Sequence, residues 1–335
     1  MPDTLPLCMI GAGGHSSRNM YPYFWLLKRG RVVANADLDL GRAQRVAAQF
    51  GIERSYSDHR AMLEREKPAG VLVCVNSTFH AEVAVELLNA GYHVYLEKPS
   101  CNTLAEARAM LEAARANDRV CMTAYKKRFG PAYMKTKAII EGEDFGDPVL
   151  LTLLRTRGPF TPTDDPNDAY LLQWGCHVVD LVTYLFGDIA SVSAMKTGPS
   201  PYAYAVTFRF TNGAVGTFAV SDRIKGRNWE DVAIVGTGGV SIRLQNATEM
   251  LAARDNVPFA HHKPDWVSGS SLGPIEQGYS GEIQAFIDAI ADGRQPEANI
   301  EQSAHTMAIY EAIQQSAERA GELTEIASIE PAGAR

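Results

Sequence analysis

Residues 5–16 read LPLCMIGAGGHS, and this stretch gives the first indication of how the chain folds. Its apolar first half is typical of a buried strand, and the pattern G-x-G-x-x-S follows it directly, before a helix-like segment. Gly11 permits a tight turn, Gly13 lets the backbone approach a pyrophosphate on the N–H groups of the next helix, and Ser16 is small enough for close helix–strand packing. The order of strand, glycine turn and helix predicts a dinucleotide-binding unit, although glycine-rich turns are common by themselves.

A second strand, residues 31–36, ends at Asp37, which lies 21 positions after Ser16. This is close to the spacing expected for an acid that binds the adenosine ribose hydroxyls. A carboxylate at this place repels a 2′-phosphate, and no arginine follows at once to accept one, so NAD is favoured over NADP. Arg42 is the nearest candidate for the opposite preference. The alternative is that Asp37 is a strand-end aspartate that caps the helix from Gly41.

The alternation of strand and helix patterns continues to residue 124. The expected strands are apolar and continuous, as in a parallel sheet that is covered on both faces. After the two strands above come strands at 71–75, 93–96 and 120–124, with helices at 81–89 and 103–115. The pattern predicts an α/β fold, a doubly wound Rossmann domain over residues 1–124 with six strands, of which the five above are located in the sequence.

The tripeptide Glu97-Lys98-Pro99 follows the strand at 93–96. Lys98 therefore lies at the carboxyl end of a strand, where open α/β sheets place their ligands. Position alone leaves an alternative, since a lysine in a surface loop is usually a solvated charge.

Four further segments occur with this tripeptide: Gly11-Ala12-Gly13-Gly14-His15, Ala36-Asp37-Leu38-Asp39, Tyr125-Lys126-Lys127-Arg128-Phe129 and Gly175-Cys176-His177-Val178-Val179-Asp180. In this order the five segments resemble the glucose–fructose oxidoreductase/inositol dehydrogenase (Gfo/Idh/MocA) oxidoreductases, over nearly the whole chain. The resemblance implies an NAD cofactor and a catalytic role for Lys98. The candidate cofactor-binding residues are Gly11, Gly13, Gly14, His15, Asp37, Asn76, His80 and Glu97.

The loop after the strand at 71–75 departs from the family pattern. The family usually has T-P-N-x-x-H, whereas this chain has Val75-Asn76-Ser77-Thr78-Phe79-His80 and keeps only the histidine. The usual contacts of this loop with the cofactor are therefore in doubt, and the alternative for His80 is that it caps its own helix.

The pattern changes after residue 129. Strands are expected at 149–157, 189–196, 202–210, 214–221 and 231–235, and Asn212-Gly213 is a strong hairpin signal. Helices are expected at 131–141, 281–291 and 303–320. Residues 125–335 are thus predicted to form an α+β substrate-binding domain on an open, mostly antiparallel sheet. The resemblance implies helices on one face and dimer or tetramer contacts on the other.

The segment Gln173–Leu181 matches the family motif D-x-G-x-H-x-x-D except at its first position. If the helix begins early enough, Gln173, His177 and Asp180 share one helix face. The match places His177 on the catalytic acid/base, while the alternative is a histidine satisfied within the core. Gln173 stands where the family usually has aspartate, and glutamine can donate and accept hydrogen bonds but cannot ionise.

Several cationic side chains are candidates for holding the substrate. Arg155 and Arg157 alternate on a strand end that the family turns toward its substrate, and with Lys126 and Arg128 they could hold a carboxylate or phosphate. Solvated charges on an edge strand are the alternative. The full set of substrate-binding candidates is Lys98, Tyr125, Lys126, Arg128, Arg155, Arg157, Gln173 and Asp180.

Composition excludes several classes of function. The chain has 335 residues, a formal net charge of -7 and a pI near 5.7, which argues against binding to nucleic acid or to an anionic membrane. The five cysteines are scattered without a CxxC pair, and the N-terminus reads as a strand instead of a signal peptide. We therefore expect reduced thiols in the cytoplasm. The sequence contains no Cys/His cluster with the spacing of a metal site, so no metal is expected.

These observations predict an NAD-dependent sugar or polyol dehydrogenase that acts on CH–OH. Its substrate would be a sugar, sugar derivative or cyclitol, and its hydride would pass between a secondary hydroxyl carbon and nicotinamide. One alternative is redox-neutral glycoside cleavage with tightly held NAD. The other is a non-catalytic regulator that senses NAD or a sugar on the same fold.

Overall fold

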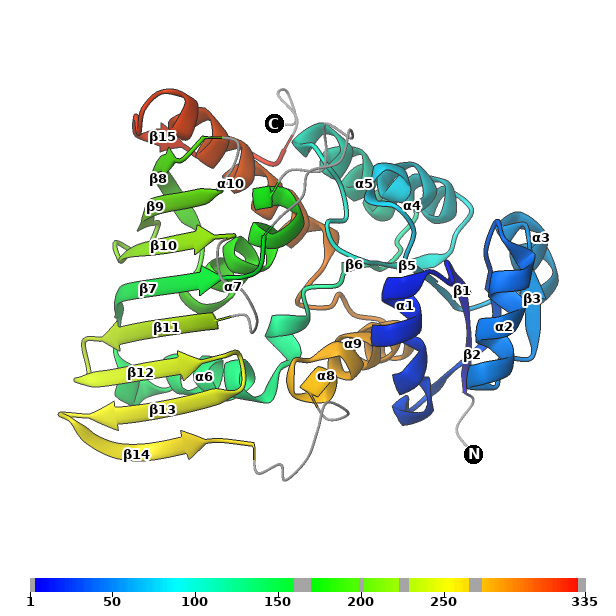
Figure 1. Cartoon of the computed structure of the whole chain (residues 1–335), viewed down its shortest axis with the longest axis horizontal. Helices are drawn as coiled ribbons and strands as arrows, with labels where there is room; N and C mark the ends of the chain where they lie inside the picture. Colours follow the sequence, from blue (N-terminus) through cyan, green and yellow to red (C-terminus); the bar gives the residue numbers. More distant parts are fainter. Residues whose placement is uncertain (1–3, 160–169, 199–201, 223–228, 265–272, 331–335) are drawn as a thin grey trace. The chain divides into compact units, whose positions relative to one another are not determined.

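The structure is a computed structural model, and it describes residues 4–159, 170–198, 202–222, 229–264 and 273–330. The chain divides into two compact units (Figure 1). The first contains Met1–Lys126, Tyr279–Ala304 and Glu330–Arg335, and the second contains Lys127–Gly278 and His305–Ile329. The first boundary thus lies two residues after the expected one.

The first unit is built on a parallel sheet of six strands in the order β3-β2-β1-β4-β5-β6. The strands are β1 (Leu5–Ile10), β2 (Gly30–Ala36), β3 (Arg54–Tyr56), β4 (Gly70–Val73), β5 (His93–Leu96) and β6 (Cys121–Thr123). The helices between them are α1 (Gly14–Asn19), α2 (Leu40–Phe50), α3 (His59–Glu66), α4 (His80–Asn89) and α5 (Leu104–Ala116), with short 3₁₀ turns at Tyr21–Leu26 and Ser77–Phe79. This confirms the doubly wound Rossmann architecture.

The helix α9 (Tyr279–Asp292) belongs to this first compact unit, although its residues lie within the range predicted for the second domain. The reason is packing against two glycines that begin strands. A Cβ on Gly30 would lie 2.8 Å from Ile287, and one on Gly70 would lie 2.9 Å from Ile290. The Phe286 ring also contacts Tyr95 of β5, at 5.9 Å between centroids. The bare glycine backbones let α9 lie directly on the sheet, and this contact is not visible in local sequence.

The second unit is built on a nine-stranded sheet in the order β14-β13-β12-β11-β7-β10-β9-β8-β15. The strands are β7 (Pro148–Thr156), β8 (Ile189–Lys196), β9 (Ala203–Phe210), β10 (Val215–Ser221), β11 (Trp229–Gly236), β12 (Val240–Gln245), β13 (Glu249–Arg254), β14 (Val257–His262) and β15 (Thr324–Glu325). Neighbouring strands are antiparallel except for β7 and β10. The predicted open, mostly antiparallel sheet is confirmed.

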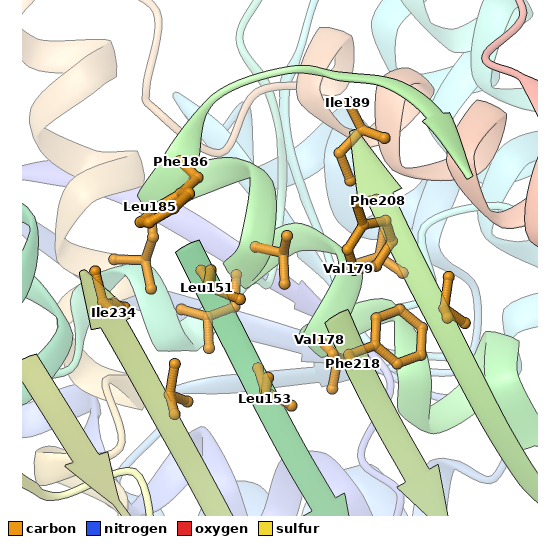
Figure 2. Close-up of a cluster of buried hydrophobic side chains, with 14 of the residues drawn as sticks. Leu151, Leu153, Val178, Val179, Leu185, Phe186, Ile189, Phe208, Phe218 and Ile234 are labelled. Atoms are coloured by element: carbon orange, nitrogen blue, oxygen red, sulfur yellow. The ribbon is translucent and has the colours of Figure 1, made fainter. Parts of the chain in front are cut away.

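Helices pack on one face of this sheet. They are α6 (Pro131–Ile140), α7 (Cys176–Phe186) and α10 (Ile300–Glu318), and α10 begins in the first unit. Figure 2 shows the part of this core between α7 and the sheet, where Val178 and Val179 of α7 face Leu151 and Leu153 of β7. Short turns lie at Lys126–Phe129 and Glu143–Phe145, and a four-residue helix α8 at Gly273–Glu276. This core fixes α7, the helix that carries His177.

The α-helix around His177 begins later than its sequence pattern suggested. Residues Leu171–Gly175 form a π-helical turn, and α7 starts only at Cys176. Gln173 therefore lies in the π turn, while His177 and Asp180 lie in the α-helix. Such single π turns are rare and are frequent at functional sites.

Candidate functional site

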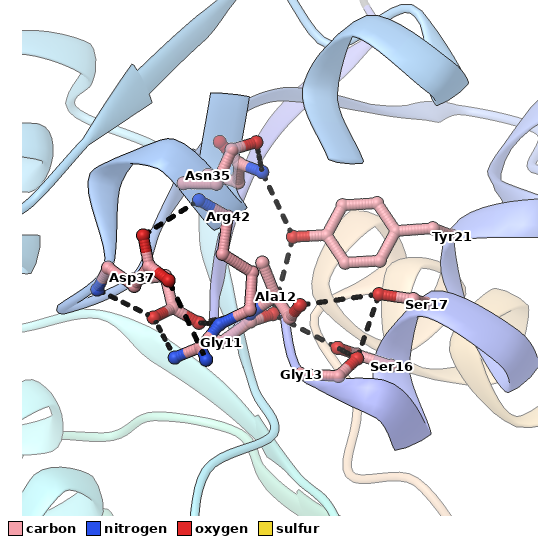
Figure 3. Close-up of polar contacts among 11 residues, drawn as sticks. Gly11, Ala12, Gly13, Ser16, Ser17, Tyr21, Asn35, Asp37 and Arg42 are labelled. Atoms are coloured by element: carbon pink, nitrogen blue, oxygen red, sulfur yellow. Dashed lines mark hydrogen bonds and ion pairs between the residues drawn. The ribbon is translucent and has the colours of Figure 1, made fainter. Parts of the chain in front are cut away.

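The glycine turn after β1 has the geometry that its sequence predicted. Gly11 has a φ of +104°, and a Cβ on it would lie 2.1 Å from the carbonyl oxygen of Cys74, so no other residue fits there. A Cβ on Gly13 would meet nothing within 4 Å, which leaves its backbone open to a ligand. The buried Ser16 hydroxyl donates to the carbonyl oxygens of Gly11 and Gly13 at 3.2 and 3.1 Å and holds the turn together (Figure 3).

Asp37, at the end of β2, is bound to this turn. Its carboxylate accepts a hydrogen bond from the backbone N–H of Ala12 at 2.8 Å and contacts Arg42 Nη2 at 2.5 Å (Figure 3). Burial raises the pKa of Asp37, but the hydrogen bonds from Arg42 and Ala12 outweigh it and leave the pKa below its usual value. The helix cap of α2 is Asp39, which accepts from Arg42 N at 2.9 Å, so the alternative reading of Asp37 as that cap is wrong.

These residues fit a dinucleotide. The strand order reverses between β1 and β4, and open α/β sheets bind their ligands at such a point beyond the carboxyl ends of the strands. The open backbone at Gly13 lies there, followed by Gly14, and the ionised Asp37 carboxylate is positioned to accept hydrogen bonds from a ribose.

Glu97 and Lys98 follow β5 in the same unit. The Glu97 side chain is buried, and its carboxylate lies 3.2 Å from Nε2 of His15, the residue just after the glycine turn. The side-chain N–H of Asn19 donates to Nδ1 of His15, at 3.3 Å, which leaves Nε2 to donate to Glu97. Burial raises the pKa of Glu97, while His15 and Lys98 lower it by more, and the pKa falls below its usual value. The contact joins the glycine turn to the loop that carries Lys98.

The loop after β4 also supports this segment. Nδ1 of the buried His80 lies 2.7 Å from the carbonyl oxygen of Pro99, and burial lowers the pKa of His80, so it donates as a neutral imidazole. The side chain therefore ties α4 to the residue after Lys98 and does not cap its own helix, which corrects that alternative. Asn76 accepts from the N–H of Thr78 at 3.1 Å and caps the short turn at Ser77–Phe79.

Glu282 is a buried carboxyl group that sequence reasoning missed. It lies on α9 in line with Phe286, is fully buried, and has no well-aligned hydrogen-bond partner among the described residues. Burial, followed by the charge of Glu97, raises its pKa well above the usual value, which favours the neutral acid. An acidic residue in phase with the apolar stripe of α9 is the sequence signal that could have revealed it.

Two further candidates of the first unit lie at its boundary. Tyr125 is buried, and Lys126 Nζ lies 3.8 Å from the ring centroid of Tyr279. The His15 ring is 6.3 Å from the same tyrosine ring. Tyr279 therefore connects Lys126 with the His15–Glu97 contact. Sequence position alone could not show that Tyr279 contacts either residue.

In the second unit, His177 is buried on α7, one turn before Asp180. Arg128 Nη2 contacts Asp180 Oδ1 at 2.6 Å, and its Nε lies 3.0 and 3.1 Å from the two carboxylate oxygens. Burial raises the pKa of Asp180, and Arg128 opposes that rise. Arg128 and Asp180, both substrate-binding candidates by sequence, are thus engaged with each other in a buried ion pair.

A second buried network was not anticipated. Glu230 of β11 contacts Lys127, Tyr133 and, at 3.5 Å, Arg155. Burial lowers the pKa of Lys127 to about 8 even though Glu230 opposes the change. Lys127 and Glu230 lie far apart in sequence, so no local pattern could have paired them.

The structure thus distributes the sequence-predicted residues between the two units. The first holds Gly11, Gly13, Gly14, His15, Asp37, Asn76, His80, Glu97, Lys98, Tyr125 and Lys126. The second holds Arg128, Arg155, Arg157, Gln173, His177 and Asp180. Among the described residues no group of His, Cys, Asp or Glu side chains is arranged to hold a metal ion. In the same part of the chain, no helix has the length and apolar character needed to cross a membrane.

Comparison with known families identifies the chain. Residues 6–125 match the NAD-binding Rossmann fold of the Gfo/Idh/MocA oxidoreductase family, and residues 137–324 match its C-terminal α/β domain. The chain belongs to the Gfo/Idh/MocA family. The expected family, fold, oxidoreductase class and NAD cofactor are thereby confirmed.

Several members of the Gfo/Idh/MocA family are similar over most of their length. A levoglucosan dehydrogenase from Pseudarthrobacter phenanthrenivorans is 26% identical, over 88% of this chain and 90% of that protein. A myo-inositol 2-dehydrogenase from Thermotoga maritima is 28% identical, over 57% and 60%. The structure of a levoglucosan dehydrogenase in complex with NADH and levoglucosan superposes with a TM-score of 0.84 at 24% identity, covering 96% of this chain and 99% of that one.

Proposed function

We propose that this protein is an NAD-dependent dehydrogenase that transfers a hydride between nicotinamide and a secondary hydroxyl carbon of a sugar, sugar derivative or cyclitol. The observation that carries the proposal is the His15–Glu97 contact at 3.2 Å, because it holds the loop of Lys98 against the glycine turn of the cofactor site. The family relatives named as levoglucosan and myo-inositol dehydrogenases support this substrate class.

Lys98 and His177 are the proposed catalytic groups. When bound, NAD supplies the nicotinamide carbon that accepts or returns the hydride. The Lys98 ammonium would donate a hydrogen bond to the reacting oxygen and stabilise the developing alkoxide. His177, whose residue type titrates near neutral pH, would accept the hydroxyl proton. Each proton-handling group of this kind typically contributes about 10²–10⁴-fold to the rate.

Two features of the second unit support the role of His177. The buried Arg128–Asp180 pair fixes α7 one turn beyond the histidine, so these two residues enter the proposal as positioning groups instead of substrate ligands. Gln173, in the π turn before α7, can orient a substrate hydroxyl by hydrogen bonding but cannot take a proton. In this proposal the hydroxyl proton therefore passes to His177.

The test is a screen of the purified protein with NAD⁺ against levoglucosan, myo-inositol, scyllo-inositol, neutral hexoses, sugar acids and glycosides. The expected result is reduction of NAD⁺ with at least one member and a rise in melting temperature with the same member, because a ligand of the folded state stabilises it. Release of free sugar from glycosides without net NADH would instead establish redox-neutral cleavage. If no compound in the screen gave either NAD⁺ reduction or glycoside cleavage, the proposal would be overturned.

We further propose that the protein is a cytoplasmic homo-oligomer that associates through the nine-stranded sheet. All five cysteines are free thiols, which suits a reducing compartment. The sheet face opposite the helices exposes Met195, Val215 and Trp229, and it is hollowed along a groove lined by Met195 and Trp229. Apolar groups gathered on one face favour a second copy of the chain as occupant. Light scattering should give a dimer or tetramer, and Trp229→Glu should shift it toward monomer; a monomeric wild type would contradict this.

A further inference from the structure

The end of β7 carries two arginines on the face of the sheet that the helices cover. Side chains alternate along a strand, so Arg155 and Arg157 point to the same side as the buried Leu151 and Leu153. Arg157 follows the last residue of β7 and still donates its backbone N–H to Ser221 of β10, at 3.0 Å. Both arginines are therefore held on regular sheet backbone and are not solvated edge-strand charges.

Trp174 connects these arginines to the segment that carries His177. The guanidinium of Arg157 lies over the Trp174 ring, 3.2 Å from its centroid, and Arg155 Nη1 donates to the Trp174 carbonyl oxygen at 3.3 Å. Trp174 belongs to the π turn and stands three residues before His177. Stacking on an aromatic ring fixes the plane of a guanidinium and leaves its N–H groups available at the edges.

The charged side chains around Arg157 are already engaged by other groups. Lys127 and Arg155 share the carboxylate of Glu230. Arg128 is neutralised by Asp180. The buried Asp222 accepts from the backbone N–H of Tyr202 at 2.9 Å.

Arg157 has no carboxylate partner among the described residues. Its Nε and Nη1 are buried without an acceptor. Burial and then the like charge of Arg155 lower its pKa, and only Tyr170 opposes them. A cation kept in this state costs folding free energy, and an anion from outside the chain would relieve that cost.

We propose that Arg157, stacked on Trp174 beside the segment of His177, binds an anionic oxygen group of the substrate. The substrate is then a polyhydroxylated carboxylic acid or a sugar phosphate instead of a neutral sugar. This inference rests on the proposed function and narrows its substrate class. The second cation, Arg155, is already partly neutralised by Glu230 and supports the site through Trp174.

The experiment measures melting temperature and turnover of the full chain with NAD⁺ and four probes: D-glucose, D-gluconate, D-glucuronate and D-glucose 6-phosphate. It compares wild type with Arg157→Gln, which removes the charge, and with Arg157→Lys, which keeps the charge but loses the planar donor set. Arg319→Gln, at an exposed position of the same unit, is the matched control. Melting temperature reports binding even when a probe is not turned over, so it separates failure of this inference from failure of the proposed dehydrogenase activity.

The expected result is stabilisation by at least one anionic probe and less by D-glucose. Arg157→Gln should weaken the binding or raise the KM of that probe about 10- to 100-fold, the loss expected for a hydrogen bond to a charged group. Arg157→Lys should lose less, and Arg319→Gln nothing. Stabilisation by the acids identifies a carboxylate, and stabilisation by D-glucose 6-phosphate alone identifies a phosphate.

The ligand-free variants provide a second readout. If Arg157 serves to bind a ligand, Arg157→Gln should melt at the same temperature as wild type or higher, because it removes a buried charge that has no carboxylate partner in the described part of the chain. A large fall in melting temperature, with probe binding unchanged in Arg157→Lys, would show a purely structural arginine and overturn the inference. Equal or tighter binding of D-glucose than of all three anions would overturn it as well.

Discussion

His15 Nε2 and Glu97 Oε1 lie 3.2 Å apart, although 82 residues separate them in the chain. The contact joins the glycine turn after β1 to the loop after β5. Two regions that act on one cofactor in the proposed reaction are thereby fixed to each other inside a single unit. Because Lys98 directly follows Glu97, the same contact sets the position of the proposed catalytic lysine.

Replacing His15 tests this relationship. In His15→Ala, Glu97 loses the hydrogen bond that lowers its pKa, and we expect the KM for NAD⁺ to rise about tenfold, since His15 is partly exposed and its contact is worth less than a buried one. His15→Gln, which can still donate to Glu97, should recover most of the loss. Steady-state kinetics with NAD⁺ as the varied substrate measures both. An unchanged KM for NAD⁺ in His15→Ala would show that the His15–Glu97 contact does not contribute to cofactor binding.

The pairing of Arg42 with Asp37 makes a prediction about cofactor choice. In the wild type the Asp37 carboxylate repels a 2′-phosphate and also occupies the guanidinium of Arg42, with Nη2–Oδ1 at 2.5 Å and Nε–Oδ2 at 3.1 Å. Asp37→Ser should remove the repulsion and release Arg42, raising the NADP⁺/NAD⁺ ratio of kcat/KM about 100-fold. Adding Arg42→Ala should abolish most of that gain. A wild type that prefers NADP⁺ would contradict the role given to Asp37.

Lys98 and His177 should behave as one catalytic unit. We expect Lys98→Ala and His177→Ala each to lower kcat by about 10²–10⁴-fold while NAD⁺ still binds, because in the proposed mechanism Lys98 stabilises the alkoxide that forms as His177 takes the proton. Residues that act together are not additive, so the double variant should be little worse than the poorer single variant. Lys28→Ala, an exposed lysine of the first unit, is the control. Undiminished kcat in Lys98→Ala would remove that residue from the mechanism.

Glu282 should make stability depend on pH. A carboxyl group whose pKa is raised in the folded protein holds a proton that the unfolded chain releases near pH 4.5, so the free energy of unfolding falls as pH rises above that value toward the folded pKa. Glu282→Gln mimics the neutral acid and removes this dependence. The melting temperature of the variant relative to wild type should therefore increase from about pH 5 to about pH 8.

The matched control for this measurement is Glu64→Gln, at an exposed position of the same unit. Its melting temperature relative to wild type should stay level across the same pH range, because an exposed carboxyl group has nearly the same surroundings in the folded and unfolded chain. If the melting temperature of Glu282→Gln relative to wild type also stayed constant across this pH range, Glu282 would be ionised in the folded protein.

Local sequence was sufficient for the features that depend on neighbouring residues. The glycine turn at Gly11 follows from backbone sterics, and the strand at 93–96 and the helix at 103–115 follow from their apolar periodicity. The short β3 was not located, since its three residues are all half-buried and show no alternation. The π turn at Leu171–Gly175 was also missed, because the same residues at the same spacing suit an ordinary helix.

Sequence by itself thus determined the Rossmann unit, the mostly antiparallel sheet and NAD as the cofactor, and it predicted the residues that are proposed to bear the chemistry. Tertiary structure alone decided which partners those residues contact. It paired Arg128 with Asp180 across 52 positions, turned His80 to Pro99, seated α9 on Gly30 and Gly70, and left Arg157 stacked on Trp174. The physical reason is that turn geometry and periodicity act between near neighbours, whereas burial and charge compensation depend on segments that only the folded chain brings together.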